Sequence, residues 1–136
     1  MLNLDEIYMQ QAFKEALIAK KKNEVPVGSV IVYEKKIIAK SHNMSIRLCD
    51  PTAHAEIQAI TSACNYLKSR YLENCTIYTT LEPCIMCAGA LFWAKIGRIV
   101  YGASDKKQGM SLIKHNIIHP KTKINSGVLE YECGYL

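Results

Sequence analysis

Residues 50–90 have the sequence DPTAHAEIQAITSACNYLKSRYLENCTIYTTLEPCIMCAGA, in which helix and strand signals alternate. The opening Asp-Pro-Thr triplet is a turn and helix-start signal, and we predict a helix over His54–Leu67. The β-branched and aromatic run Cys75–Thr80 predicts a strand. Pro83 lies where a second helix should begin, which suits proline, and this helix should cover Cys84–Lys95. These residues therefore predict a helix–strand–helix unit.

The N-terminal third adds one helix and a hairpin. Asn3 can cap a helix that runs to about Lys22, with Glu6 as the capping-box partner. The apolar residues of this helix have helical spacing and should form its core stripe: Met9, Ala12, Phe13, Ala16 and Leu17. Gly28–Tyr33 and Lys36–Lys40 predict two strands joined by a short polar turn.

Beyond the second helix, Arg98–Tyr101 predicts another strand and Gly102–Gly109 a loop. The predicted order is helix, strand, strand, helix, strand, helix, strand. Strands separated by helices favour an α/β fold whose sheet is covered by helices on both faces, with parallel crossovers after the first hairpin.

The bulk composition is that of one globular domain. The chain has 136 residues, of which 49% are hydrophobic and 21% are charged, enough to bury a core without disulfides. The sequence contains no run of 18 apolar residues, so it predicts no membrane span. The acidic start, residues 1–6, does not resemble a secretory signal. We therefore expect a cytoplasmic protein with no membrane partner.

The six cysteines could form three disulfides, but thiols stay reduced in the cytosol. Only Cys84 and Cys87 are closely spaced. The remaining four are interpreted as small buried hydrophobic residues: Cys49, Cys64, Cys75 and Cys133.

The net charge of +5 is unevenly distributed. Residues 95–125 contain one acidic residue, Asp105, and seven basic ones: Lys95, Arg98, Lys106, Lys107, Lys114, Lys121 and Lys123. Such a stretch could attract a polyanion, or it could be an ordinary solvated face.

One histidine, two cysteines and one glutamate form the candidate site. His54 and Cys84 each start a predicted helix, and both helix N-termini should meet at one edge of the sheet. Cys84 and Cys87 share a helix face, and a helix N-terminus favours their thiolates. With His54 they would leave the fourth position of a tetrahedral zinc open, as in catalytic sites. Zinc would lower the pKa of a bound water to about 7. Glu56 could then reach this water without binding the metal and carry the water's proton.

Each half of this motif is weak on its own. A lone Cys-x-x-Cys could be redox-active or half of a zinc ribbon. A ribbon needs four ligands, whereas no second Cys-x-x-Cys pair exists and His42, His115 and His119 are not spaced like one. A thioredoxin-like site would not need His-Ala-Glu 30 residues upstream. The combination His-x-Glu…Pro-Cys-x-x-Cys is therefore specific for a catalytic zinc site.

This combination is the signature of zinc nucleobase deaminases. Within that superfamily the chain resembles the bacterial tRNA-specific adenosine deaminases from about Asp5 to Pro120. The matching stretches are Val25-Pro26-Val27-Gly28, Asp50-Pro51-Thr52-Ala53-His54-Ala55-Glu56-Ile57 and Thr80-Leu81-Glu82-Pro83-Cys84-Ile85-Met86-Cys87-Ala88-Gly89-Ala90.

The resemblance implies conversion of adenosine to inosine at the wobble position of a tRNA anticodon. It implies one Zn²⁺ per subunit, held by His54, Cys84 and Cys87, with Glu56 protonating N1 of a flipped-out adenine. The fold should be a three-layer α/β/α sandwich with a central five-stranded mixed sheet, and the enzyme a homodimer that binds the tRNA anticodon stem-loop.

Further contacts are implied by position. Asn43 should hydrogen-bond the purine, the Ala55 backbone should meet the base edge, Val27 should form an apolar wall, and Asp105 should lie near the RNA backbone. Without the resemblance, Asn43 could be a turn residue, Val27 a core residue and Asp105 a solvated loop residue.

Two matters stay open. Residues 1–136 should form a single zinc-dependent deaminase domain, but its C-terminal helix, starting near Gly127, is incomplete at Leu136, which puts tight RNA binding in doubt. A deaminase of a free base or nucleoside, such as guanine, cytosine or cytidine, would have the same zinc core. A noncatalytic RNA-binding partner is disfavoured because it would tend to lack Glu56.

Overall fold

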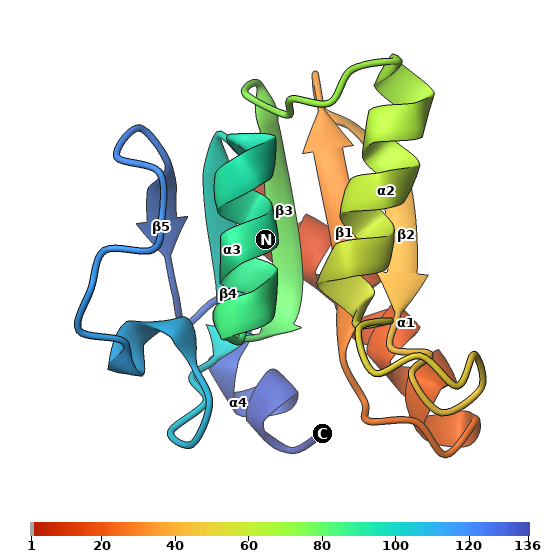
Figure 1. Ribbon diagram of the computed structural model, residues 1–136. Coiled ribbons are helices and arrows are strands. Elements are labelled where there is room, and N and C mark those ends of the chain that lie inside the picture. The colour runs from red at the N-terminus through yellow and green to blue at the C-terminus, as the bar shows by residue number, and fades with distance from the viewer. Residues whose placement is uncertain (1) are drawn as a thin grey trace.

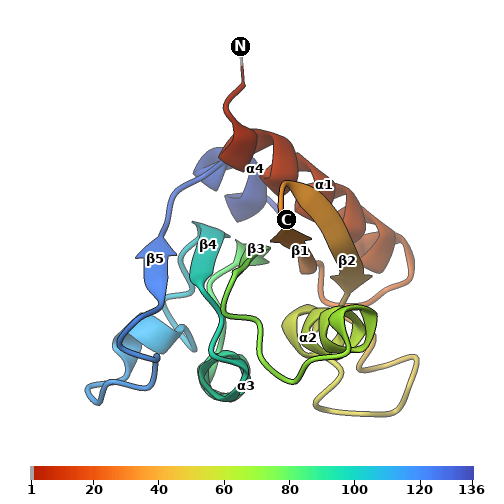
Figure 2. The same cartoon turned by 90° about the horizontal axis from the view of Figure 1, so that it is seen from above.

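The computed structural model describes residues 2–136. Its elements follow the order α1 (Leu4–Lys21), β1 (Gly28–Tyr33), β2 (Lys36–His42), α2 (Ala55–Leu67), β3 (Cys75–Leu81), α3 (Ile85–Ala94), β4 (Arg98–Ala103), η1 (Met110–Leu112), β5 (Lys123–Asn125) and α4 (Glu130–Gly134). Helices α2 and α3 cover one face of the sheet, and α1 and α4 cover the other (Figures 1 and 2). Within residues 2–136, no helix is both long and apolar enough to cross a membrane.

The strands of residues 2–136 form one five-stranded sheet in the order β2-β1-β3-β4-β5. Strand β1 is antiparallel to both β2 and β3, whereas β3, β4 and β5 are mutually parallel. The predicted three-layer α/β/α sandwich with a mixed five-stranded sheet is confirmed. Strand β5, which the sequence did not locate, adds a short parallel edge next to β4.

The N-terminal helix confirms its capping prediction and corrects one core residue. The Asn3 side chain accepts from the Glu6 N–H and the Glu6 carboxylate accepts from the Asn3 N–H, which completes the capping box. Leu17 was predicted to be buried but is exposed. Small residues on α1 let its backbone approach β1 so closely that a Cβ on Gly28 would overlap Ala12. The stripe therefore continues through Ala19 rather than a leucine.

An apolar cluster fills each side of the sheet. Between the sheet and α2 and α3 lie Ile31, Ile77, Leu91 and Ile99, among others. The opposite cluster joins α1 and α4 to the sheet and includes Met9, Val30, Tyr78, Val100 and Cys133. Alternate residues of β1 and β3 point into different clusters, as strand geometry requires.

Two helix starts differ from the prediction by one residue, and β2, β3 and β4 extend one or two residues beyond their predicted ends. His54 and Cys84 are the N-caps of α2 and α3, not their first residues. Pro83 therefore precedes the cap instead of starting α3. Strand β4 extends through Gly102 and Ala103 because Ala103 still pairs with Leu81, so the predicted loop begins at residue 104.

The basic stretch does not form one surface. Arg98 makes a bidentate ion pair with Asp5, with nitrogen–oxygen distances of 2.6 and 2.9 Å, so its charge is already matched. Lys123 pairs in register with Arg98, and Lys95 caps the C-terminus of α3. In contrast, Lys106–Lys107 follow β4 at the end of the sheet where Leu81 and Ala103 lie. The basic residues therefore divide between opposite ends of the parallel strands.

Candidate active site and metal centre

The three predicted metal ligands converge. Their ligand atoms, one each from His54, Cys84 and Cys87, all lie within 4.8 Å of one another. His54 Nδ1 is 3.7 Å from Cys84 Sγ and 3.5 Å from Cys87 Sγ. Nitrogen and sulfur ligands at about 2.1 and 2.3 Å from a tetrahedral zinc would lie roughly 3.6 Å apart. The donor set and its spacing therefore fit a zinc ion with a fourth position open.

The fold explains this convergence. Helices α2 and α3 pack side by side on the same face of the sheet, with their N-termini at the same end (Figure 1). His54 and Cys84 are the N-cap residues, and Cys87 lies in the first turn of α3. Residues 30 positions apart are thus brought together by one crossover through β3.

The two thiols share a hydrogen bond, and this sets their acidity in opposite directions. The hydrogen bond from Cys87 and nearby backbone N–H groups lower the pKa of Cys84 to about 5, despite its partial burial. The same hydrogen bond, together with burial, raises the pKa of Cys87. One proton is therefore lost easily and the second is retained until a cation replaces it, which is the behaviour of a metal-binding thiol pair.

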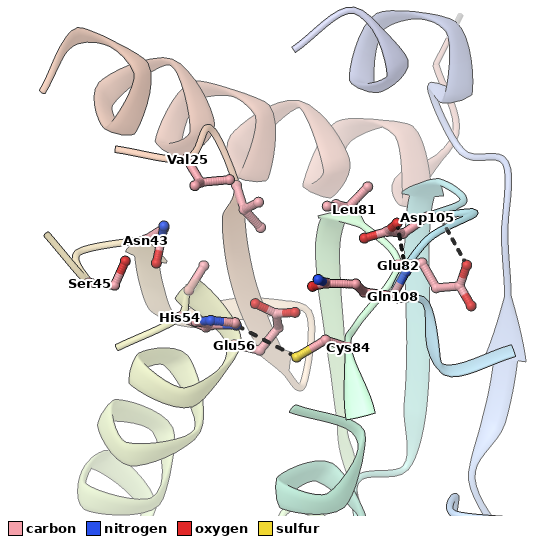
Figure 3. A pocket seen from close by; sticks show the side chains of 12 residues that line it. Val25, Asn43, Ser45, His54, Glu56, Leu81, Glu82, Cys84, Asp105 and Gln108 are labelled. Carbon is pink, nitrogen blue, oxygen red and sulfur yellow. Dashed lines mark hydrogen bonds between the residues drawn. The ribbon is translucent and has the colours of Figure 1, made fainter. Parts of the chain in front are cut away.

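Glu56 lies beside the ligands but deep in the protein. It is in the first turn of α2, only 4% exposed, and its side chain lies between His54 and Cys84 (Figure 3). Burial raises the pKa of its carboxyl group from 4.5 to about 7. A carboxyl group with this pKa can both accept and donate a proton near neutral pH.

A cavity of about 230 Å³ opens onto these groups. The four predicted contact residues, Val27, Asn43, Ala55 and Asp105, all line it. Figure 3 shows Asn43 on one side of the cavity and Asp105 on the other.

Two of these contact residues have polar groups free to meet a ligand. Asn43 is 5% exposed, and its Oδ1 has no hydrogen-bond partner among residues 2–136. The carbonyl of Ala55 accepts a hydrogen bond from Ser41 Oγ at 2.7 Å. The Ala55 N–H is available to a ligand because N–H groups in the first turn of a helix, here α2, have no partner within the helix.

Asp105 serves its own loop as well as the cavity. Its Oδ1 accepts from the backbone N–H groups of Lys107 and Gln108, at 3.0 and 3.1 Å. Asp105 therefore holds the backbone of its own loop and also lines the cavity.

Several lining residues were not predicted, among them Val25, Ser45, Leu81, Glu82 and Gln108. Glu82 is adjacent to the Pro-Cys-x-x-Cys motif, and that proximity was the available signal. Ser45 and Gln108 lie in loops whose sequences carry no motif, so only the tertiary structure brings them to the cavity.

The comparisons with known proteins bear on this geometry. The family model described as the cytidine and deoxycytidylate deaminase zinc-binding region matches residues 2–103, which include His54, Cys84 and Cys87. The chain belongs to this deaminase family. The recognition of a zinc-binding deaminase is therefore confirmed.

Within the family, the similar proteins point to one subgroup. A "tRNA-specific adenosine deaminase" from Bacillus subtilis (strain 168) is 44% identical over 135 residues, covering 96% of this chain and 84% of that protein. A solved structure from a study of A-to-I editing by tRNA:A34 deaminases at the wobble position has a TM-score of 0.89. It is 39% identical to this deaminase, with coverage of 95% of this chain and 97% of the other.

A guanine deaminase from Bacillus subtilis is also similar. Its structure has a TM-score of 0.71 and 39% identity, over 73% of this deaminase and 64% of the guanine deaminase. The free-base alternative therefore has a relative too, but the match covers less of both chains.

Proposed function

We propose that this deaminase converts adenosine to inosine at the wobble position of a tRNA anticodon. The observation that carries the proposal is the convergence of His54, Cys84 and Cys87 around Glu56 in one cavity. The relatives named tRNA-specific adenosine deaminase, similar over nearly the whole chain, support the choice of substrate.

The three ligands would hold one Zn²⁺ per subunit. Zinc bound there would lower the pKa of a coordinated water to about 7 and so supply a hydroxide nucleophile at neutral pH. The low pKa of Cys84 supports this role, because a thiolate is the form that binds metal.

Glu56 would carry protons between water and base. It would take a proton from the attacking water and deliver it to N1 of the adenine as oxygen adds to C6. It would then take the proton of the new C6 hydroxyl group and pass it to the amino nitrogen, so that the C6–N bond breaks and ammonia leaves while the C6 carbonyl forms. Its burial and its pKa of about 7 support both steps, because the group can be a carboxylate before attack and a carboxylic acid after it.

The cavity walls would select and orient the base. The Oδ1 of Asn43, buried and without a partner within residues 2–136, would accept a hydrogen bond from the purine. The Ala55 N–H would contact the base edge and Val27 would pack against the ring. Asp105, on the opposite rim, would meet the RNA backbone beside Lys106 and Lys107.

A homodimer is the proposed assembly. Along α3, Ile85, Gly89 and Trp93 occupy one face, with Ile85 57% and Trp93 77% exposed. A Cβ on Gly89 would meet nothing within 4 Å in the part of the chain described, so this face is open. An apolar helix face of this kind is typical of a subunit interface. A second copy of the chain would bury this α3 face. A tRNA substrate would place the dimer in the cytoplasm.

Residues 1–136 are proposed to act as a single domain. Support comes from residues 2–136, where one sheet separates two apolar clusters and carries every ligand of the site on a single face.

The test is inosine formation in an anticodon stem-loop RNA with adenosine at the wobble position, using zinc-loaded protein. Free adenosine, cytidine and guanine are assayed in parallel, and an RNA with guanosine at the wobble position serves as the matched control. We expect conversion of the adenosine RNA only. Conversion of free guanine or cytidine instead would replace the proposal by the free-base alternative.

A further inference from the structure

Glu82 is a second buried carboxylate at the cavity, and its contacts differ from those of Glu56. It is 2% exposed, yet both of its oxygens are occupied by backbone amides. Oε1 accepts from the Asp105 N–H at 3.0 Å, and Oε2 accepts from the Ser111 N–H at 2.7 Å. A buried carboxylate that accepts one backbone N–H on each oxygen acts as a structural anchor for the segments that donate to it.

Glu82 anchors the loop of residues 104–111 to the strand end that precedes Cys84. Two backbone contacts join the same two segments. Gly109 forms a β-bridge with Cys84, and the Met110 N–H donates to the Pro83 carbonyl at 2.9 Å. A Cβ on Gly109 would lie 2.4 Å from Glu82 Oε1, so the loop backbone is in close contact with the carboxylate.

This loop carries the far wall of the cavity. Asp105 and Gln108 line it, opposite Asn43 and Ser45 (Figure 3). Lys106 and Lys107 are exposed on the same loop. The position of this rim relative to the metal ligands therefore depends on the backbone contacts of Gly109 and Met110 and on the two hydrogen bonds to the Glu82 side chain.

We propose that Glu82 is a positioning residue that fixes the 104–111 rim for substrate binding. The proposal rests on the proposed function, because the substrate whose binding is measured is the stem-loop RNA. Charge-assisted hydrogen bonds to backbone N–H groups are among the stronger ones in proteins, so a carboxylate is well suited to hold a loop that a large ligand presses against. Glu82 would act through Asp105 and Gln108 and would not touch the reacting atoms.

The main test variant is Glu82→Gln, which keeps the size but replaces one accepting oxygen by an N–H donor. Gly109→Ala disturbs the same contact from the loop side and leaves the carboxylate in place. Asp5→Asn is the control, because it removes a carboxylate with two side-chain partners, Arg98 and Tyr78, on the other face of the sheet. For each protein, zinc content, KM and kcat on the stem-loop RNA, and amide hydrogen exchange at Asp105 and Ser111 are measured.

We expect both Glu82→Gln and Gly109→Ala to raise KM by about tenfold, because weakening a charge-assisted hydrogen bond that holds the rim should weaken RNA binding by about that factor. The kcat should stay within about twofold, zinc should remain bound, and exchange at Asp105 and Ser111 should accelerate. Asp5→Asn should change none of these. Loss of zinc, a fall in kcat with unchanged KM, or unchanged amide exchange in Glu82→Gln would each overturn the proposal.

Failure of the proposed function would be recognised separately. It would show as no conversion of the RNA by the unmodified protein, whatever the variants do. The exchange rates of Asp105 and Ser111 need no substrate, so they decide the anchoring role of Glu82 in either case.

Discussion

Replacing Glu56 by glutamine should abolish catalysis and, in the zinc-free protein, stabilise the fold. Burial raises the pKa of Glu56 from 4.5 to about 7, so folding disfavours its charged form. At about 1.4 kcal/mol per pH unit, this shift corresponds to about 3 kcal/mol. Glutamine has nearly the same shape as glutamate but no charge, so it avoids the free-energy cost of burying a carboxylate.

The sign of the pH dependence follows from the direction of the shift. Because the pKa is raised on folding, the folded state binds the proton more tightly than the unfolded state does. The contribution of Glu56 is therefore most favourable below pH 4.5, declines as the pH rises, and is fully lost above about pH 7. The stability advantage of Glu56→Gln should accordingly be near zero at pH 4.5 and reach about 3 kcal/mol at pH 8.

The assay is urea unfolding of both proteins with a chelator present, at several values between pH 4.5 and 8. Neither apolar cluster includes a predicted metal ligand, so we expect the zinc-free chain to fold. Comparing the two proteins at each pH cancels the contributions of Cys84 and the other titrating groups to first order. A difference that stays constant with pH would refute the reasoning that burial, rather than shape, governs Glu56.

The deaminase activity of Glu56→Gln is measured after zinc has been restored. Removal of a general acid–base group typically costs about 10²–10⁴-fold in rate. We expect Glu56→Gln to lose at least this much inosine formation while it retains zinc. Near-normal activity would exclude Glu56 as the proton carrier.

Three further outcomes are expected. Cys84→Ala and Cys87→Ala should each lose zinc and activity, whereas the control variant Cys64→Ala should keep both. Zinc content is measured by atomic emission, and full zinc content in Cys84→Ala or Cys87→Ala would refute the ligand set. The pKa of Asp5 is lowered by its arginine partner, so its stabilising effect is full above pH 3.8 and is lost as the pH falls further. Asp5→Asn should therefore lower the free energy of unfolding by about 1 kcal/mol or less at pH 7, and a gap that does not shrink as the pH falls below 3.8 would contradict this assignment. Trp93→Glu should convert a dimer into monomers of 15.3 kDa in sedimentation experiments, and an unchanged mass would mean that the α3 face is not the interface.

The local elements could be predicted because their signals are local. The Asn3–Glu6 capping box, the α2 helix and the β3 run each depend on residues a few positions apart, and the structure confirms them. Strand β5 could not be predicted, because three exposed residues are too few for an alternation signal and become a strand only by pairing with β4.

The candidate site divides in the same way. The spacing of Cys84 and Cys87 and the chemistry of His54 and Glu56 predicted a catalytic zinc site, and the structure brings these four residues together. The sequence could not indicate that Glu82 holds the loop that follows β4, since the residues that donate to Glu82, Asp105 and Ser111, lie 23 and 29 residues further along the chain.

The sequence by itself thus determined the chemistry, through residue types at fixed short separations on two helices. Only the tertiary structure decided the environment of that chemistry. Packing of α2 and α3 on one face buries Glu56 and shifts its pKa, and the sheet separates the basic residues of one continuous stretch between its two ends. Burial and charge proximity depend on distances through space, which sequence order does not specify.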